Sequence, residues 1–278
     1  MKILIAASEL EPFISSGKMA GRIRNISKVA KKDVEIEYII PLYTLVDENQ
    51  FDLKPTGKGF EIPVADKVEN AEIWEGTHPE TGCRVWFVSN RYFERDGLYG
   101  NDTGDYPDNA ERFVFFSRSV LEVAKHMSKP QIIHCNDWQT ALVPLYLNEV
   151  YKKAGQLNDV RCVLSIHDIR FQGRFWLYDL YILNLGWEVF SPDKLEFYND
   201  INFLKGGIVY SDAILTVNED YSGKILTPEL GCGMEGVLEK YRDKLFPIGL
   251  KDSLIFDNGP FDGELSDRLI KFYKQVAK

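Results

Sequence analysis

The sequence predicts a single α/β domain with a mostly parallel sheet, helices on both faces and a β-hairpin extension. Strand-like and helix-like patterns alternate along most of its 278 residues, which is typical of βαβ units around a parallel sheet. Two apolar runs, at residues 131–133 and 162–166, each lead into a polar segment that contains a histidine and an aspartate. A hydrophobic content of 45% is enough for one large buried core.

Each element of the first half is predicted from the spacing of its apolar residues. Short apolar runs bounded by glycine or proline favour strands, whereas apolar residues three and four positions apart favour helices. The resulting order is a strand at 1–7, a polar loop at 8–18, a helix at 22–31, a strand at 34–40 and hairpin strands at 60–64, 72–74 and 84–88. The three hairpin strands are expected to extend the sheet.

The second half continues the alternation, and capping side chains mark two of its boundaries. Asp108 is expected to cap a long helix, with Glu111 completing a capping box, and Asn218 is expected to cap a later helix. The remaining elements are helices at 109–127, 141–151, 201–210 and 267–276 and strands at 131–133, 162–166, 213–217 and 254–256. We expect residues 1–260 to form the domain and residues 261–278 to form a terminal helix that packs back on it.

Composition and charge argue against several functional classes. A formal net charge of -9 does not supply the basic footprint that nucleic-acid binding needs. The four cysteines lie far apart without a CxxC pair, which is typical of reduced thiols. No apolar run approaches the roughly 20 residues of a membrane span, and the first one is too short for a signal peptide core. We therefore expect a cytoplasmic protein that binds neither nucleic acid nor membranes.

The two polar segments that follow strands are the candidate functional site. Residues 134–140 read His-Cys-Asn-Asp-Trp-Gln-Thr, and residues 167–173 read His-Asp-Ile-Arg-Phe-Gln-Gly. In an open parallel sheet, ligands bind outside the carboxyl ends of the strands, next to helix N-termini. Two strand ends that each carry an imidazole and a carboxylate therefore predict a binding site. The alternative is that each histidine caps its strand and satisfies backbone groups.

Several segments together resemble the N-terminal catalytic domain of bacterial glycogen synthases and plant starch synthases. They occur in the order found in that family, over roughly residues 1 to 245. The matching segments are residues 7–13, 98–100, 108–113, 134–145, 167–173, 201–210 and 227–236. By this resemblance the chain is identified as a member of the glycogen and starch synthase family.

The resemblance implies a fold and a ligand class. Members of the family have two facing Rossmann-like domains, the GT-B arrangement. The N-terminal domain mainly holds the acceptor α-glucan, and the C-terminal one mainly holds ADP-glucose or UDP-glucose. The resemblance covers only the first domain. It implies retaining glucosyl transfer without metal or cofactor. Because the cationic groups that stabilise the departing diphosphate belong to the second domain, we expect the isolated chain to be inactive.

The chain departs from the family pattern on the donor side. Where the family has a Lys-Thr-Gly-Gly-Leu loop, the aligned positions include Ser15, Ser16, Gly17 and Lys18. Lys18 either replaces the missing lysine or places a Cβ where close backbone approach is needed. Asp168 stands where the family has asparagine, which adds a negative charge. Residues 249–253 replace the family's Asn-Gly-Ile-Asp hinge. We interpret residues 15–18 as a remnant of the donor loop.

The acceptor side matches the family better. The residues that the resemblance places in the α-glucan cleft are Glu9, Tyr99, Asp137, Trp138, Gln139 and Asp168, and His167 takes the family position beside the reaction centre. A sugar presents hydroxyls and an apolar face, so a carboxylate beside an aromatic ring suits it. Two structural alternatives stay open, namely that Trp138 anchors the core and that Glu9 caps the first loop.

Three hypotheses follow for the function. The first is a glycogen or starch synthase-like protein that is inactive alone and retains a cleft for α-1,4-glucan or malto-oligosaccharide. The second is a subunit of a split glucan synthase that a separate C-terminal-half chain completes. The third is a non-catalytic protein that forms a homo-oligomer through the face where a second domain would dock.

Overall fold

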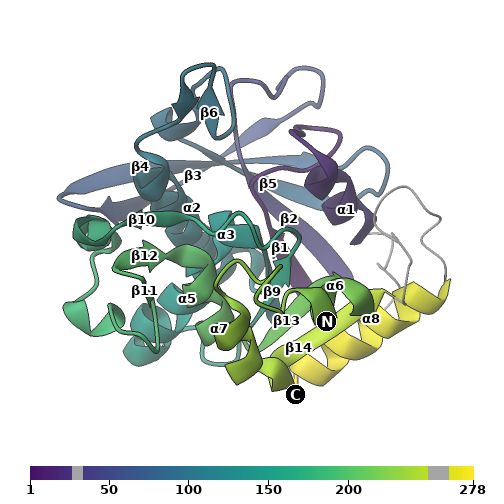
Figure 1. Ribbon diagram of the computed structural model, residues 1–278. Helices are drawn as coiled ribbons and strands as arrows, with labels where there is room; N and C mark the ends of the chain where they lie inside the picture. The colour runs from purple at the N-terminus through teal and green to yellow at the C-terminus, as the bar shows by residue number, and fades with distance from the viewer. Residues whose placement is uncertain (27–33, 250–262) are drawn as a thin grey trace.

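A nine-stranded sheet forms the centre of the molecule (Figure 1). The computed structural model describes residues 1–26, 34–249 and 263–278. The strand order is β14-β13-β9-β8-β1-β2-β5-β4-β3. The bounds are β1 (Lys2–Ala6), β2 (Glu35–Pro41), β3 (Lys54–Val64), β4 (Lys67–Thr77), β5 (Arg84–Ser89), β8 (Ile132–Asn136), β9 (Arg161–Ile166), β13 (Ala213–Asn218) and β14 (Leu245–Gly249).

The pairing of these strands confirms the predicted sheet. The seven strands from β14 to β5 pair in parallel, so their carboxyl ends meet at one edge of the sheet. β4 pairs antiparallel with β5, and β3 pairs antiparallel with β4, which makes β3 and β4 the predicted hairpin extension. The inner strands are buried along nearly their whole length because helices cover both faces.

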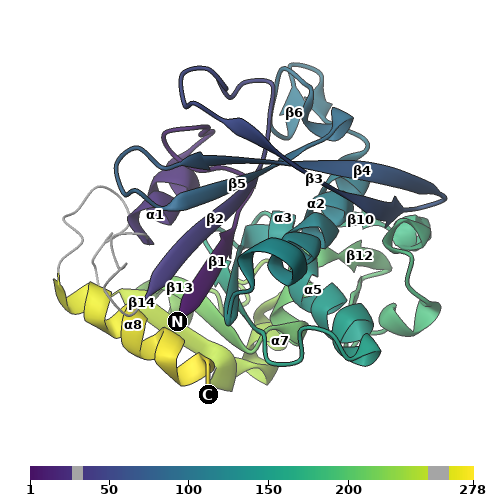
Figure 2. The same ribbon diagram turned by 180° about the vertical axis from the view of Figure 1, so that it is seen from behind.

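Helices cover both faces of the sheet, as predicted. α2, α4 and α5 pack against one another on one face, and Figure 2 shows α2 and α5 in front of the strands. On the other face, α1 and α8 contribute Ile26 and Leu269 to a pocket that strand residues also line. The α-helices are α1 (Lys18–Ile26), α2 (Asn109–Val123), α3 (Asp137–Thr140), α4 (Leu142–Tyr146), α5 (Phe203–Tyr210), α6 (Glu219–Lys224), α7 (Glu235–Lys240) and α8 (Gly263–Val276).

Short 3-10 and π segments extend or connect these helices. The π segments η3 and η4 continue α2 and α4, so the predicted helices at 109–127 and 141–151 are each present as two consecutive pieces. Their bounds are η2 (Arg91–Phe93), η3 (Ala124–Ser128), η4 (Leu147–Tyr151), η5 (Lys152–Ala154), η6 (Leu177–Leu183), η7 (Trp187–Val189) and η8 (Arg242–Lys244).

One of the two predicted caps is wrong and the other is confirmed. The carboxylate of Asp108 accepts from Arg95 Nη1 at 2.8 Å instead of capping α2, and Glu111 accepts from the hydroxyl of Tyr92 at 2.8 Å. A guanidinium is a stronger partner for a carboxylate than a backbone amide, so the ion pair replaces the capping box. Asn218 Oδ1 does accept from the amide of Tyr221 at 2.7 Å and caps α6.

The structure also contains small sheets and strand ends that the sequence did not predict. A three-stranded antiparallel sheet combines β10 (Arg174–Trp176), β12 (Asp200–Asn202) and β11 (Glu196–Phe197), and a hairpin pairs β6 (Gly100–Asn101) with β7 (Gly104–Asp105). The helix predicted at 201–210 therefore begins only at Phe203, after β12. β8 continues to Asn136, α1 begins at Lys18, and β14 was missed, while the strand predicted at 254–256 lies outside the described residues.

The terminal helix α8 lies along the edge of the molecule next to β14 (Figure 1). Arg268 Nη2 donates to the carbonyl of Pro247 in β14 at 3.4 Å, and Leu269 and Tyr273 are fully buried. None of the helices in the described segments is both long and apolar enough to cross a membrane.

Candidate functional site

The site forms where β1, β8 and β9 end side by side. These three strands are adjacent and parallel, so Glu9, Asp137 and His167, which follow them, are brought to one edge of the sheet. Asn136, the last residue of β8, joins the strand ends. Its Nδ2 donates to the carbonyl of Ala6 at 3.0 Å, and its Oδ1 lies 2.9 Å from Nε2 of His167. The two polar segments therefore lie side by side.

Asn136 determines which nitrogen of His167 carries the proton. The amide nitrogen of Asn136 donates to two carbonyls, so its oxygen must accept from His167 Nε2–H. Nδ1 of His167 is then an acceptor, and it is buried with no hydrogen-bond partner among the described residues. Burial lowers the pKa of His167 to about 3, and the positive charge of Arg22 acts in the same direction. His167 therefore presents a neutral ring with one unused acceptor.

Asp137 occupies a strained position at the start of α3. Its φ is 51°, in the left-handed region that residues other than glycine rarely adopt, and its side chain is buried. Its Oδ1 accepts from the amide of His167 at 2.7 Å. Burial raises the pKa of Asp137 to about 7, while hydrogen bonds from the amides of His167 and Asp168 lower it. The carboxyl group is therefore close to half ionised near neutral pH.

Trp138 packs in the core, which favours the alternative that the sequence left open for this residue. Only 9% of its surface is exposed, and its ring packs edge-on to Phe113 at 4.8 Å between centroids and also contacts Phe175 and Phe203. A Cβ on Gly173 would lie 2.5 Å from the Trp138 ring, so the backbone is as close as a glycine allows. Beside it, Gln139 is buried, and its Oε1 has no partner in the parts of the chain that are described.

Glu9 organises the first loop instead of facing open space. Its carboxylate accepts from the amide and the hydroxyl of Ser16, at 2.5 and 2.9 Å, and from the hydroxyl of Tyr99 at 2.8 Å. The Tyr99 hydroxyl also lies 2.7 Å from Ser8 Oγ. These contacts fit the alternative that Glu9 holds the first loop, and its contact with a sugar stays a prediction. Tyr99 remains half-buried, with its ring against Phe113.

The residues predicted to be a donor-loop remnant form a turn that leads into α1. Ser15 Oγ donates to the carbonyl of Gly17 at 3.0 Å, and Ser16 is held by Glu9. A Cβ on Gly17 would meet nothing within 4 Å, whereas Lys18 already belongs to the helix. The amide and hydroxyl of Ser16 are thus used inside the protein rather than offered to a ligand.

Charged side chains surround the strand ends. Asp168 is partly exposed and forms a bidentate pair with Arg170, whose hydrogen bonds hold the pKa of Asp168 below its usual range. Arg22 of α1 is close enough to lower the pKa values of His167, Asp137 and Asp168 as a secondary cause. The sequence analysis included Asn136 in the polar segment 134–140 without assigning it a role, and it missed Arg22, which lies in no pattern that distinguishes it from other polar residues.

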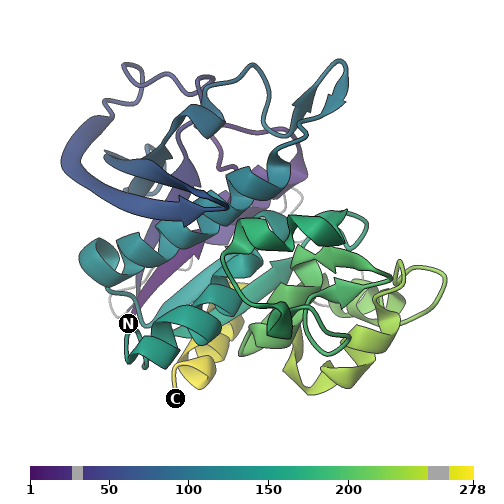
Figure 3. The same ribbon diagram turned by 90° about the vertical axis from the view of Figure 1, so that its left-hand side faces the viewer.

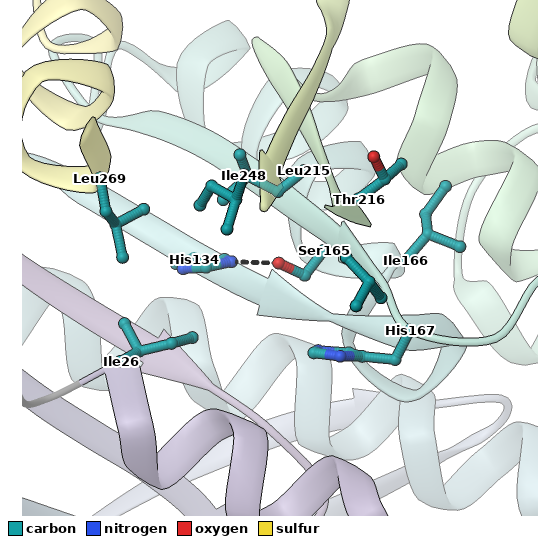
Figure 4. Close-up of a pocket in the computed structure, with 10 residues that line it drawn as sticks. Ile26, His134, Ser165, Ile166, His167, Leu215, Thr216, Ile248 and Leu269 are labelled. Carbon is teal, nitrogen blue, oxygen red and sulfur yellow. Dashed lines mark hydrogen bonds between the residues drawn. The ribbon is translucent and has the colours of Figure 1, made fainter. Parts of the chain in front are cut away.

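His134 lies inside the sheet and is not part of this site. Its Nδ1 is 2.6 Å from the hydroxyl of Tyr273 in α8, and its Nε2 is 2.6 Å from Ser165 Oγ in β9. Burial lowers the pKa of His134 to about 3. A narrow, mostly apolar pocket runs between the sheet and the helices α1 and α8, from His134 past Ser165 to His167 (Figure 4). Its apolar walls include Ile26, Leu215, Ile248 and Leu269.

The strand ends carry hydrogen-bonding groups from His167, Asp137 and Gln139. Within the described residues, no group of three or more His, Cys, Asp or Glu side chains is placed to hold a metal ion. What the strand ends offer is a neutral imidazole acceptor, a carboxyl group with a pKa of about 7 and an amide oxygen, from His167, Asp137 and Gln139. Hydroxyl-rich ligands supply the donors that such acceptors need.

Comparison with known proteins gives consistent matches. The family model described as the starch synthase catalytic domain matches residues 2–240. The glycogen synthase of Syntrophotalea carbinolica is 35% identical over 259 residues, which cover 91% of this chain and 53% of that protein. Glycogen synthase 2 of Geobacter metallireducens is 36% identical over 280 residues, with 100% and 57% coverage.

A solved structure shows the same fold. The catalytic domain of starch synthase IV from Arabidopsis thaliana, bound to ADP and acarbose, matches with a TM-score of 0.80 and 28% identity. The match covers 88% of this chain and 50% of that one. The chain thus spans about half the length of the relatives that it matches.

Proposed function

Because the chain belongs to the starch synthase catalytic domain family, we propose that residues 1–278 form the acceptor-binding half of an α-1,4-glucan glucosyltransferase. The complete reaction joins the 4-hydroxyl of a glucan end to the anomeric carbon of glucose and releases the nucleoside diphosphate of ADP-glucose or UDP-glucose. The residues described here supply the side of the cleft that holds the glucan, with retention of anomeric configuration expected from the family.

The observation that carries this proposal is the unused acceptor on His167. An unpaired polar atom in a buried position costs free energy, typically about 1 to 3 kcal/mol, unless a ligand or water pairs with it. Nδ1 of His167 is such an atom, and Asn136 holds it in the accepting form. A glucan hydroxyl supplies the missing donor. Gln139 Oε1, two residues after Asp137, is a second acceptor that has no partner within the described ranges.

Asp137 complements these acceptors. With a pKa of about 7, its carboxyl group accepts hydrogen bonds from hydroxyls when it is ionised and can donate one hydrogen bond when it is protonated. The structure that resembles this chain at a TM-score of 0.80 is of a protein bound to ADP and acarbose, which supports a ligand site of this kind. We propose that Glu9 and Tyr99 position the loop beside that site. Asp168, paired with Arg170, places charge at its edge.

Transfer itself needs groups beyond those described. The departing diphosphate must be stabilised by cations in a closed site. In the loop at residues 15–18 the Ser16 amide is bound to Glu9, so it does not receive a phosphate. We therefore propose that these residues alone bind glucan and do not transfer glucose, and that a donor-binding half, on this or another polypeptide, completes the site.

The four cysteines support an intracellular setting for this function. Cys83, Cys135, Cys162 and Cys232 are all free thiols, and three of them are buried. Reduced thiols are typical of proteins in the cytoplasm. We propose that the protein is cytoplasmic.

Calorimetric titration of residues 1–278 with maltoheptaose tests the proposal. We expect saturable binding that weakens about tenfold in His167→Ala. The variant lacks the imidazole, so the complex loses one hydrogen bond between neutral groups. Val68→Ala changes an exposed side chain of the β3-β4 hairpin and is the matched control, expected to bind like the parent protein. Absence of binding at millimolar sugar by correctly folded protein would contradict the proposal.

A transfer assay tests the second part. Incubation of the pure chain with labelled ADP-glucose or UDP-glucose and maltoheptaose is expected to give no extended product. Steady chain extension would show that residues 1–278 contain a complete donor site. Extension only after addition of a separate donor-half polypeptide would support the split arrangement.

A further inference from the structure

Helix α2 begins with two buried polar side chains, Asn109 and Arg112. Asn109 is only 5% exposed, and Arg112 is completely buried. A guanidinium away from water costs free energy unless hydrogen bonds replace its hydration, and Nη2 of Arg112 has no partner among the residues that the structure describes. A positive charge in the first turn also opposes the helix dipole. The start of α2 therefore gains little stability from this arginine.

The hydrogen bonds of Arg112 and Asn109 lead out of α2 to the loop that carries Tyr99. Arg112 Nη1 donates to Oδ1 of Asn109 at 2.7 Å, and its Nε donates to the carbonyl of Tyr92 at 2.8 Å. Because an arginine can only donate, the side-chain oxygen of Asn109 must face it and the side-chain nitrogen must face the other way. That nitrogen, Nδ2, donates to the carbonyl of Tyr99 at 2.8 Å. Arg112 thus fixes the orientation of the amide that holds Tyr99.

Tyr99 needs this support because the hairpin that follows it has little packing of its own. Residues 101–105, which include most of the β6-β7 hairpin, are all exposed, and Figure 3 shows the hairpin standing out from the body of the molecule beside the start of α2. At its far end, the amide of Tyr106 donates to the Tyr99 carbonyl at 2.9 Å, and the Arg112 guanidinium lies 5.1 Å from the centroid of the Tyr106 ring. Both ends of the hairpin are therefore held by Asn109 or Arg112.

The side chain of Tyr99 connects these contacts to the candidate site. Its hydroxyl donates to Glu9 Oε1 at 2.8 Å, and the Glu9 carboxylate also accepts from the amide of Ser16 in the first loop. A hydrogen bond weakens steeply when the distance or the angle between its groups departs from the ideal. The position of the Tyr99 backbone therefore decides whether its hydroxyl reaches Glu9.

We propose that Asn109 and Arg112 are positioning residues of the glucan site, and that they act by holding the hydroxyl of Tyr99 against Glu9. This inference rests on the proposed function, because the ligand is the glucan assigned there. Loss of either side chain displaces Tyr99 and weakens glucan binding, although neither side chain touches the sugar. The alternative is that both side chains only stabilise the fold around the start of α2.

Asn109→Asp removes the donor to Tyr99 and keeps the size of the side chain. The aspartate still offers an oxygen to Arg112, but its ionised carboxylate cannot donate to the Tyr99 carbonyl. Calorimetry with maltoheptaose is expected to show about fivefold weaker binding, the equivalent of about one hydrogen bond. Val120→Ala removes buried methyl groups from the same helix and is the matched control for lost stability. It is expected to bind maltoheptaose like the parent protein.

A double-mutant cycle tests whether Asn109 acts through the hydroxyl of Tyr99. In Tyr99→Phe that hydroxyl is absent, so the further addition of Asn109→Asp is expected to change the affinity by less than about twofold. The same weakening by Asn109→Asp in both backgrounds would show two independent effects and overturn the inference. Normal binding by Asn109→Asp alone, or by Tyr99→Phe alone, would overturn it as well.

Tyrosine labelled with carbon-13 at Cζ gives an NMR readout that a general loss of stability does not move. The Tyr99 signal, assigned by its loss in Tyr99→Phe, is expected to shift in Asn109→Asp and in Arg112→Lys and to stay in place in Val120→Ala. Lysine keeps the charge of Arg112 but has no planar fork, so it cannot bond Tyr92 and Asn109 in the same geometry. An unchanged signal in either of the first two variants overturns the inference.

The outcomes also separate this inference from the proposed function. If the parent protein binds maltoheptaose and Asn109→Asp binds it equally well, the proposed function stands and the inference fails. If the parent protein binds no maltoheptaose, the proposed function fails together with the ligand named here, and the Tyr99 signal still decides whether Asn109 and Arg112 position that side chain.

Discussion

The regions around His134 and His167 look alike in sequence and differ in what the protein does with them. Both histidines belong to polar segments at neighbouring strands, and burial lowers the pKa of each to about 3. His134 has a partner on both nitrogens, Tyr273 and Ser165, and it ties α8 to the sheet. His167 has a partner only on Nε2, which leaves Nδ1 unused among the described residues.

The comparison teaches that a shifted pKa does not by itself identify a functional histidine. Desolvation lowers the pKa of a buried imidazole whether or not a ligand binds there. The hydrogen-bond inventory separates the two cases, because a structural histidine is satisfied by the protein and a binding histidine keeps an atom for its ligand. We therefore expect changes at His134 to affect stability and changes at His167 to affect binding.

The largest expected effect is that of His134→Ala on stability. The substitution leaves the hydroxyls of Tyr273 and Ser165 buried without their shared partner and opens a cavity beside α8. We expect the free energy of unfolding to fall by about 3 kcal/mol, from about 1 to 3 kcal/mol for each unsatisfied group. Urea denaturation measures this loss. A stability loss below about 1 kcal/mol would contradict the structural role of His134. A loss of maltoheptaose affinity in the folded fraction would show that His134 also acts in binding.

Tyr273→Phe tests the same hydrogen bond by changing its partner in α8. The variant keeps the ring that packs in the core and removes only the hydroxyl that bonds His134 Nδ1. We expect the free energy of unfolding to fall by about 2 kcal/mol, because the His134 nitrogen becomes unsatisfied. Tyr178→Phe, at an exposed tyrosine, is the matched control and is expected to cost nothing measurable in urea denaturation.

His167→Ala is expected to weaken ligand binding more than it lowers stability, the opposite of His134→Ala. Because Nδ1 already lacks a partner, the stability loss should stay near 1 kcal/mol, mainly from the Asn136 bond. Maltoheptaose affinity should fall about tenfold, which corresponds to roughly 1.4 kcal/mol. Parallel urea denaturation and calorimetry of this variant and His134→Ala measure both quantities. Equal effects on stability and binding in the two variants would contradict the comparison.

The smallest expected effect is a pH dependence of stability that comes from Asp137, beside His167. The folded-state pKa of Asp137, about 7, lies above the usual 3.8, so the folded state holds an extra proton between these values. The contribution of Asp137 to stability is therefore complete below pH 3.8 and is lost as the pH rises through 7. The two histidines act in the opposite sense, since their lowered pKa values favour folding above pH 6.5.

Asp137→Asn isolates this contribution. It keeps an oxygen for the amide of His167 and removes the ionisation. Relative to the parent protein, its free energy of unfolding is expected to gain about 1 kcal/mol between pH 6 and pH 7, because the dependence is about 1.4 kcal/mol per pH unit below the folded-state pKa and levels off there. Urea denaturation at the two pH values measures the difference. A constant offset between the proteins would show that Asp137 does not titrate in this range.

The sequence by itself determined the fold class and the location of the site. Apolar runs such as residues 162–166 are strands because their spacing allows burial on both faces, and short-range alternation also predicted the hairpin extension. The chemistry expected at the strand ends followed from a general property of parallel sheets, whose carboxyl ends meet at one edge. Asn218 was recognised as a cap because its partner, the amide of Tyr221, lies only three residues away.

Only the tertiary structure decided what each side chain does there. Trp138 packs on rings from residues 113, 175 and 203, and Glu9 is saturated by Ser16 and Tyr99, which lies 90 positions away in the chain. Asp108 pairs with Arg95 and does not cap its own helix. Tyr273 bonds His134, which lies 139 positions earlier in the chain. A local pattern cannot reveal such partners, because hydrogen bonding and packing depend on distance in space. The difference between a satisfied His134 and an open His167 exists only once the chain has folded.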